Sequence, residues 1–137
     1  FTEFIVDGLG VTDLNGRLPP PQPPAVHDSC HGLRLLGLKQ ASRTLVGSLE
    51  NATLVAWDNS EICCGFGGLF SVKMADVSGA MLGKKMAHIE QSQADTLVTG
   101  DVSCLLHMNG GLAKQGKRPL VRHIADVLAE GIHKVKK

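Results

Sequence analysis

Four cysteines are the residues of this chain whose type and spacing could do chemistry. They are Cys30, Cys63, Cys64 and Cys104, and two of them are adjacent. Cysteine side chains can form disulfides, hold a structural zinc ion or ligate an iron–sulfur cluster. The positions of the four along the chain must therefore decide among three kinds of site.

Structural disulfides and zinc each fit the spacing incompletely. Cys63 and Cys64 would have to bridge outward from one point, and a chain of 137 residues that is 43% hydrophobic can build a core without covalent links. Zinc often uses short chelating pairs such as Cys-x-x-Cys. The candidate short pair here joins Cys104 to His107, so a Cys₃His zinc site stays open as an alternative, as does a thiol-redox site at Cys63–Cys64.

An iron–sulfur cluster fits the positions of the cysteines better. Cys30 lies where a predicted strand gives way to a helix, and Cys104 lies in the first turn of a helix that Asp101 begins. Helix N-termini lower the pKa of a thiol, and the strand-to-helix turns of a parallel sheet share one edge. Cys63 and Cys64 run into a loop whose backbone N–H groups could approach cluster sulfur. That loop consists of Gly65, Phe66, Gly67 and Gly68.

The elements that must position these residues follow from hydrophobic periodicity. The clearest helix is 75–91, where Met74, Val77, Met81, Leu82, Met86 and Ile89 recur at helical spacing. Further helices are predicted at 30–36, 40–49, 101–112 and 124–132. Strands are predicted at 25–27, 53–57, 96–99 and 119–122. Strands alternating with helices predict an α/β fold of three layers, with a mostly parallel sheet flanked by helices.

The first part of the chain reads as separate from this unit. Residues 1–9 have helical spacing, and the segment 18–24 holds five of the six prolines. We therefore expect a helix remnant and a proline-rich linker over 1–24, and the main domain over 25–137. The sequence opens at Phe1, so we also expect a natural N-terminal part that precedes it.

Composition narrows the classes of partner. The net charge is +1 and only 4% of residues are aromatic, which argues against a nucleic-acid partner. No apolar run reaches the roughly 18–20 residues of a membrane-spanning helix. The cysteine usage favours a reducing compartment, so we expect a cytoplasmic protein.

Three segments resemble the CCG cysteine-rich domain family. They are HDSCHGLR at 27–34, EICCGFGG at 61–68 and GDVSCLLH at 100–107. The likeness covers about residues 25–133. The family occurs in heterodisulfide reductase subunits and in the iron–sulfur subunits of glycolate, glycerol-3-phosphate and lactate oxidation.

The resemblance implies a Rossmann-like module and an iron–sulfur cluster, most simply [4Fe-4S], held by the four cysteines. The family pattern ends in Cys-x-x-Cys, but His107 stands at the last position here. His107, His31 and His27 are therefore candidates for an extra ligand or for hydrogen bonds close to the metal. Zinc remains the alternative metal, in a scaffold role.

The resemblance also implies an electron-transfer role and partners. The module would be the C-terminal one of two in its parent chain, and its partners would be the preceding CCG module and other subunits of a lactate or glycolate oxidation complex. It would carry electrons without catalysing the oxidation. It would lie in the cytoplasm, or at the inner face of the membrane through the complex.

Overall fold

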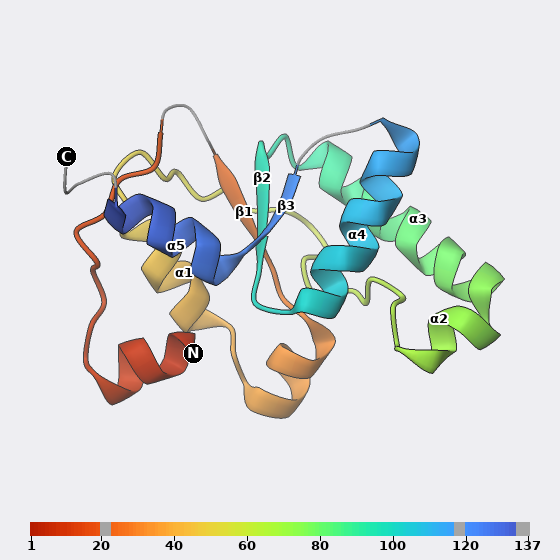
Figure 1. Cartoon of the computed structure of the whole chain (residues 1–137), viewed down its shortest axis with the longest axis horizontal. Coiled ribbons are helices and arrows are strands. Elements are labelled where there is room, and N and C mark those ends of the chain that lie inside the picture. The colour runs from red at the N-terminus through yellow and green to blue at the C-terminus, as the bar shows by residue number, and fades with distance from the viewer. Residues whose placement is uncertain (20–22, 117–119, 134–137) are drawn as a thin grey trace.

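The computed structural model describes residues 1–19, 23–116 and 120–133. Its centre is a parallel sheet of three strands, β1 (Pro24–His27), β2 (Thr96–Thr99) and β3 (Leu120–His123), in the order β1-β2-β3 (Figure 1). The register pairs Ala25 with Leu97 and Leu97 with Val121. All three strands therefore end at the same edge of the sheet.

Helices cover both faces of this sheet, as the alternating pattern predicts (Figure 1). One face carries α1 (Gln40–Gly47) and α5 (Ile124–His133), and the other carries α3 (Ala75–Gln91) and α4 (Val102–Gln115). The remaining helical segments are η1 (Phe4–Gly8), η2 (His31–Leu35) and α2 (Leu69–Lys73). The predicted three-layer α/β architecture is confirmed.

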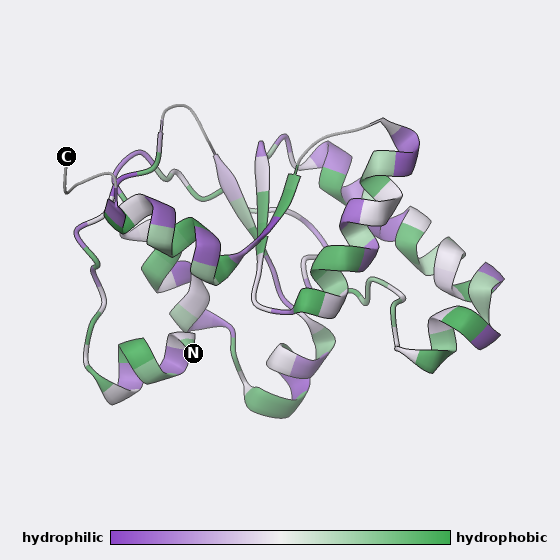
Figure 2. Cartoon of the chain, viewed as in Figure 1, coloured by the Kyte–Doolittle hydropathy of each residue, from purple (hydrophilic) through white to green (hydrophobic). Residues whose placement is uncertain are grey.

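Each face of the sheet has its own hydrophobic core, because successive strand residues point to opposite faces. Leu97 and Val121 pack with Met108 of α4 on one face, whereas Val98 packs with Leu45 of α1 and helix α5 on the other. Hydrophobic and hydrophilic residues lie side by side along α4 and α5 in Figure 2, as expected for helices with one face on a sheet.

The predicted strand over 53–57 is wrong. This segment is extended and runs beside β1, but it does not form a strand. A backbone hydrogen bond joins the two, from the N–H of Val55 to the carbonyl oxygen of Pro24 at 2.9 Å. The next acceptor on β1, the carbonyl of Val26, is taken by the indole N–H of Trp57 at 2.9 Å. A side chain thus occupies the edge of β1 where a fourth strand would continue.

Other elements differ from expectation at their ends. α1 ends at Gly47 and α4 continues to Gln115, where Gly116 adopts a left-handed conformation with φ of 63°. β3 begins at Leu120, and Pro119 of its predicted range lies outside the described residues. In the stripe of α3, Met86 and Ile89 are buried but Met74 and Val77 are exposed, because the first turns of α3 pack against α2 rather than the sheet.

The N-terminal segment is helical, as expected, and contacts the rest of the chain. Leu18 is 2% exposed and belongs to the same hydrophobic cluster as α1 and α5. The guanidinium of Arg17 binds the Glu50 carboxylate at 2.8 and 2.9 Å. The separation of 1–24 from 25–137 stays a prediction, and residues 20–22 of the proline-rich run lie outside the described part of the chain.

Candidate metal centre

Two of the cysteine positions follow directly from the ends of β1 and β2. β1 ends at His27 and is followed by Cys30 at the start of η2, while β2 ends at Thr99 and is followed by Cys104 in the first turn of α4. Asp101 caps α4, because its Oδ1 accepts the N–H of Cys104 at 3.0 Å. The predicted cap and the predicted placement at the carboxyl edge of the sheet are confirmed.

The vicinal cysteines reach the same edge on a loop that is held by glycine geometry. Gly65 has φ of 90°, and a Cβ atom there would lie 2.6 Å from the carbonyl oxygen of Ser78. Ser78 in turn donates its hydroxyl to the Gly65 carbonyl at 2.7 Å. The N–H of Gly65 donates to Sγ of Cys63 at 3.3 Å. The loop is therefore docked on α3 with one N–H group already aimed at a sulfur.

The fold brings the four sulfurs into two neighbouring pairs. Sγ of Cys64 and Sγ of Cys104 lie 3.3 Å apart, and all four cysteines are free thiols. Cys63 lies close enough to Cys30 to raise the pKa of the Cys30 thiol, and Cys64 raises it more weakly. Among the described residues, no three His, Cys, Asp or Glu side chains are arranged around one point as ligands of a single ion. The segments of the chain converge as predicted, while ligation itself stays a prediction.

In the Cys64–Cys104 pair, one of the two thiols loses its proton more readily than the other. The hydrogen bond with Cys104 lowers the pKa of Cys64 to about 6, against the effect of burial. The same hydrogen bond, together with burial, raises the pKa of Cys104. Burial and the neighbouring Cys63 raise the pKa of Cys30. Near neutral pH, Cys64 therefore carries the negative charge of its pair, and that thiolate is the form that binds a metal.

The three candidate histidines lie in different surroundings. The ring of His107 meets that of Phe66 edge-on at 5.7 Å, its Nε2 lies 3.4 Å from the Ser78 hydroxyl, and burial lowers its pKa. His31 is exposed and lines a cavity of about 230 Å³ at the same edge of the sheet. His27 is 3% exposed, and its Nδ1 lies 3.0 Å from the carbonyl oxygen of Ser60. His107 is thus beside the cysteine loop, whereas His27 lies beneath it.

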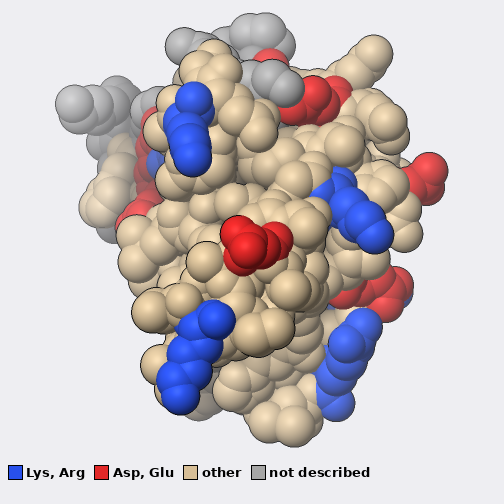
Figure 3. Space-filling model, turned by 90° about the vertical axis from the view of Figure 1, so that its right-hand side faces the viewer, with Lys and Arg blue, Asp and Glu red and all other residues tan. Residues whose placement is uncertain are grey.

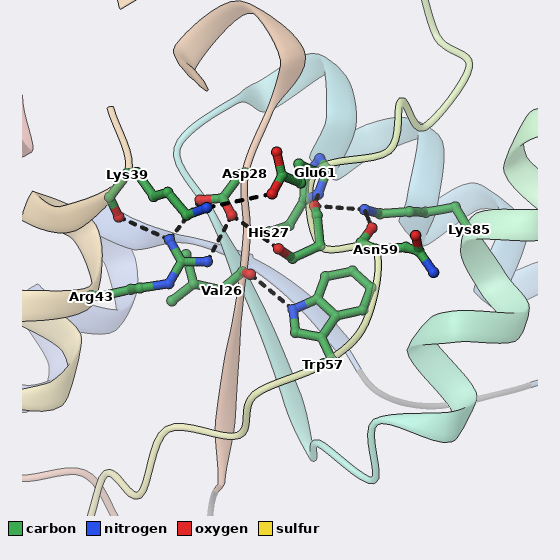
Figure 4. A network of polar contacts seen from close by, with 10 residues as sticks. Val26, His27, Asp28, Lys39, Arg43, Trp57, Asn59, Glu61 and Lys85 are labelled. Carbon is green, nitrogen blue, oxygen red and sulfur yellow. Dashed lines mark hydrogen bonds and ion pairs between the residues drawn. The ribbon is translucent and has the colours of Figure 1, made fainter. Parts of the chain in front are cut away.

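A polar network beneath the cysteine loop was missed by the sequence reasoning (Figure 4). Arg43 holds the carboxylate of Asp28 at 2.6 and 2.7 Å, and the Ser60 hydroxyl donates to the same carboxylate at 3.1 Å. The ammonium of Lys85 donates to the carbonyls of Asn59 at 3.0 Å and Ser60 at 2.7 Å. These contacts fix the segment before Cys63 to the end of β1. The signal available in the sequence was a lysine four residues from both Met81 and Ile89, on the apolar stripe of α3.

The surface formed by α2, α3 and α4 has no concentrated charge. On the face in Figure 3, Lys and Arg side chains lie singly among uncharged atoms, with Asp and Glu between them. The exposed apolar residues of this region include Leu69, Val72, Val102 and Leu106. In the part of the chain that the structure describes, no helix has the length and apolar character needed to cross a membrane.

Comparison with known proteins gives a consistent picture. Residues 24–109 match the model of the CCG family, described as a cysteine-rich domain. The chain is 47% identical over 131 residues to lactate utilization protein A of an Exiguobacterium species, covering 96% of this chain and 53% of that protein. It is 42% identical over 128 residues to lactate utilization protein A of Lysinibacillus sphaericus, covering 93% and 55% respectively.

A third relative is YkgE of Escherichia coli, which is 44% identical over 128 residues, covering 93% of this chain and 52% of the relative. The chain thus spans about half the length of the curated relatives that it matches. The family match includes Cys30, Cys63, Cys64 and Cys104 and the sheet edge where they meet. By its cysteine-bearing segments and by the match over most of its length, the chain belongs to the CCG cysteine-rich domain family.

Proposed function

We propose that this chain is an iron–sulfur-binding electron-transfer module of a lactate or glycolate oxidation system. The observation that carries the proposal is the convergence of three distant cysteine-bearing segments at the carboxyl edge of one sheet, where all four cysteines are free thiols and Sγ of Cys64 lies 3.3 Å from Sγ of Cys104. The similarity to proteins named lactate utilization protein A supports the choice of substrate system.

The residues at this edge fit a cluster by their chemistry. Thiolates are the usual ligands of iron–sulfur clusters, and Cys64 ionises more readily than an ordinary thiol. The N–H of Gly65 already points at a sulfur, and such donors raise the reduction potential of a cluster. Cys30, Cys63, Cys64 and Cys104 would be the ligands, and a bound [4Fe-4S] cluster would supply one-electron transfer.

The remaining loop residues would shield and orient the site. Phe66 packs against the core on one side and against His107 on the other, which places an apolar ring beside the thiols. The backbone N–H of Phe66 hydrogen-bonds to Cys64 and favours its thiolate. Gly67 and Gly68 both have positive φ, so the loop can turn back after the cysteines toward α2. We propose that His107 acts as an extra ligand or as a hydrogen-bond donor to the centre.

Anaerobic reconstitution with iron and sulfide tests the proposal. The loaded protein should contain iron and sulfide in equal amounts, absorb in the visible through thiolate-to-iron charge transfer, and bleach on reduction. Cys64→Ser should lose most of the bound iron, because one of the four thiolates is gone. Ser48→Ala, at the end of α1 across the sheet, is the matched control and should load like the wild type.

Metal analysis separates this proposal from a structural zinc module. One tightly held zinc per chain, with no iron uptake and no redox response, would contradict electron transfer and favour a scaffold role. A protein that takes up neither metal would refute both functions. A mixed disulfide trapped by Cys63→Ser or Cys64→Ser would instead favour thiol-redox chemistry at the vicinal pair.

We propose that the partners are the other subunits of the oxidation complex and the further chain that the relatives possess. The relatives are almost twice as long as this chain, so an additional CCG module of the parent protein is the first candidate. The location would be the cytoplasm, or the inner membrane face through the complex. Tagged full-length protein, isolated anaerobically from cells grown on lactate, should co-purify with the substrate-oxidising subunit. If the tagged protein purifies without any other subunit, this assembly is contradicted.

A further inference from the structure

Lys85 is a completely buried cation that is not one of the proposed metal ligands. It is 0% exposed, in the middle of α3. Its Nζ donates to the carbonyls of Asn59 and Ser60 and lies 4.4 Å from the ring centroid of Trp57. Within the described residues, no carboxylate forms an ion pair with it. Carbonyl oxygens and an aromatic face solvate this charge but do not neutralise it.

A buried and unneutralised ammonium group destabilises a folded chain. Burial lowers the pKa of Lys85 to about 8, while the charges of Cys64, Cys104 and Asp28 raise it. Asp28 is already paired with Arg43 at 2.6 Å. Among the residues that the structure describes, the Lys85 ammonium therefore keeps a positive charge that no ion pair offsets.

Lys85 is also tied directly to the segments that carry the cysteines. The Ser60 carbonyl that accepts from Lys85 lies 3.0 Å from Nδ1 of His27, at the end of β1 (Figure 4). Cys63 follows Ser60 by three residues, and Cys30 follows His27 by three. The ammonium group thus lies under the point where the two cysteine-bearing segments meet.

We propose that Lys85 raises the reduction potential of the centre that the four cysteines hold. This inference rests on the proposed function, because it requires a redox-active centre. Adding one electron to that centre adds one negative charge, which the fixed positive charge of Lys85 stabilises. At an effective dielectric constant of about 20, a unit charge about 12 Å away changes a one-electron equilibrium about tenfold, and a closer charge changes it more.

The experiment compares two uncharged variants of the reconstituted protein with the wild type. Lys85→Met removes the charge and the hydrogen bonds, whereas Lys85→Gln removes the charge but keeps an N–H donor for the carbonyls, on a side chain that is one bond shorter. Lys84→Met is the matched control, since Lys84 is the exposed neighbour on the same helix. The reduction potential is measured by titration with dithionite, followed by electron spin resonance, together with iron content.

Both Lys85 variants should be harder to reduce by about tenfold, equal to about 59 mV for one electron, and Lys84→Met should match the wild type. A potential unchanged in Lys85→Gln would overturn the inference and leave a purely anchoring role. Failure of both Lys85 variants to fold would also overturn the inference, because the hydrogen bonds of Lys85 to the Asn59 and Ser60 carbonyls would then be its role. A wild-type protein that takes up no cluster would instead bring down the proposed function and this inference with it.

Discussion

Replacing Gly65 by alanine should destabilise the metal-free protein by about 3 kcal/mol. Gly65 has φ of 90°, which costs a residue with a side chain about 1–2 kcal/mol. The new methyl group would also lie 2.6 Å from the Ser78 carbonyl oxygen and 2.9 Å from Cβ of Met81. Neither of these neighbours is the flexible end of a side chain, so overpacking adds about 1–3 kcal/mol.

Two glycine controls separate these contributions. Gly116 has φ of 63°, and an alanine methyl group there would meet no neighbouring atom within 4 Å, so Gly116→Ala should cost only the backbone contribution of about 1–2 kcal/mol. Gly79 lies inside α3 with open space around it, so Gly79→Ala should stabilise the helix by about 0.5–1 kcal/mol.

Urea unfolding under reducing conditions, followed by circular dichroism, measures the three variants. With a slope of about 2 kcal/mol per molar urea, the Gly65→Ala midpoint should fall by about 1.5 M. The reasoning would be refuted by a Gly65→Ala midpoint no lower than that of Gly116→Ala, since the contact with Ser78 would then cost nothing. Iron uptake should also fall in Gly65→Ala, because the Gly65 N–H that faces Cys63 would move.

Two further predictions concern the network beneath the cysteine loop. Burial lowers the pKa of His27 from 6.5 to about 4, so the unfolded chain binds a proton in this range that the folded chain does not. The free energy of unfolding should therefore fall by up to about 3 kcal/mol as the pH drops from 6.5 to 4. His27→Asn keeps an amide that can donate to Ser60 but has no group that titrates in this range. Urea unfolding at the two pH values should therefore show a smaller loss of stability for His27→Asn. Asp28→Asn should cost about 3 kcal/mol at neutral pH because it leaves the Arg43 charge without its partner, whereas Glu50→Gln, at an exposed pair with Arg17, should change the unfolding midpoint little.

Much of the fold could be predicted because local pattern and tertiary packing agree. The helix over 75–91 and the strand over 96–99 occur with their predicted ends, since each has a periodicity that one kind of element satisfies. The cap at Asp101 and the placement of Cys30 and Cys104 at the carboxyl edge follow from the order of strands and helices.

The wrong strand prediction over 53–57 also has a physical cause. Val55 and Trp57 have strand-like composition, but a strand also needs a partner with free backbone groups. Trp57 supplies its indole N–H to the acceptor on β1, so the segment stays beside the sheet without joining it. Nothing in the local sequence distinguishes a tryptophan that continues a strand from one that replaces its hydrogen bond.

The types and order of the residues were enough to indicate the architecture, the family and which thiols should meet, because these depend on periodicity and on short motifs. Only the folded chain showed that Cys64 and Cys104 form one close pair and that Lys85 is buried beneath the loop with Asp28, Arg43 and Ser60. These contacts join residues from the segment after β1, from α1, α3 and α4, and from the loop that precedes α2. Their charges and pKa values depend on burial and distance, which arise when separate segments pack together.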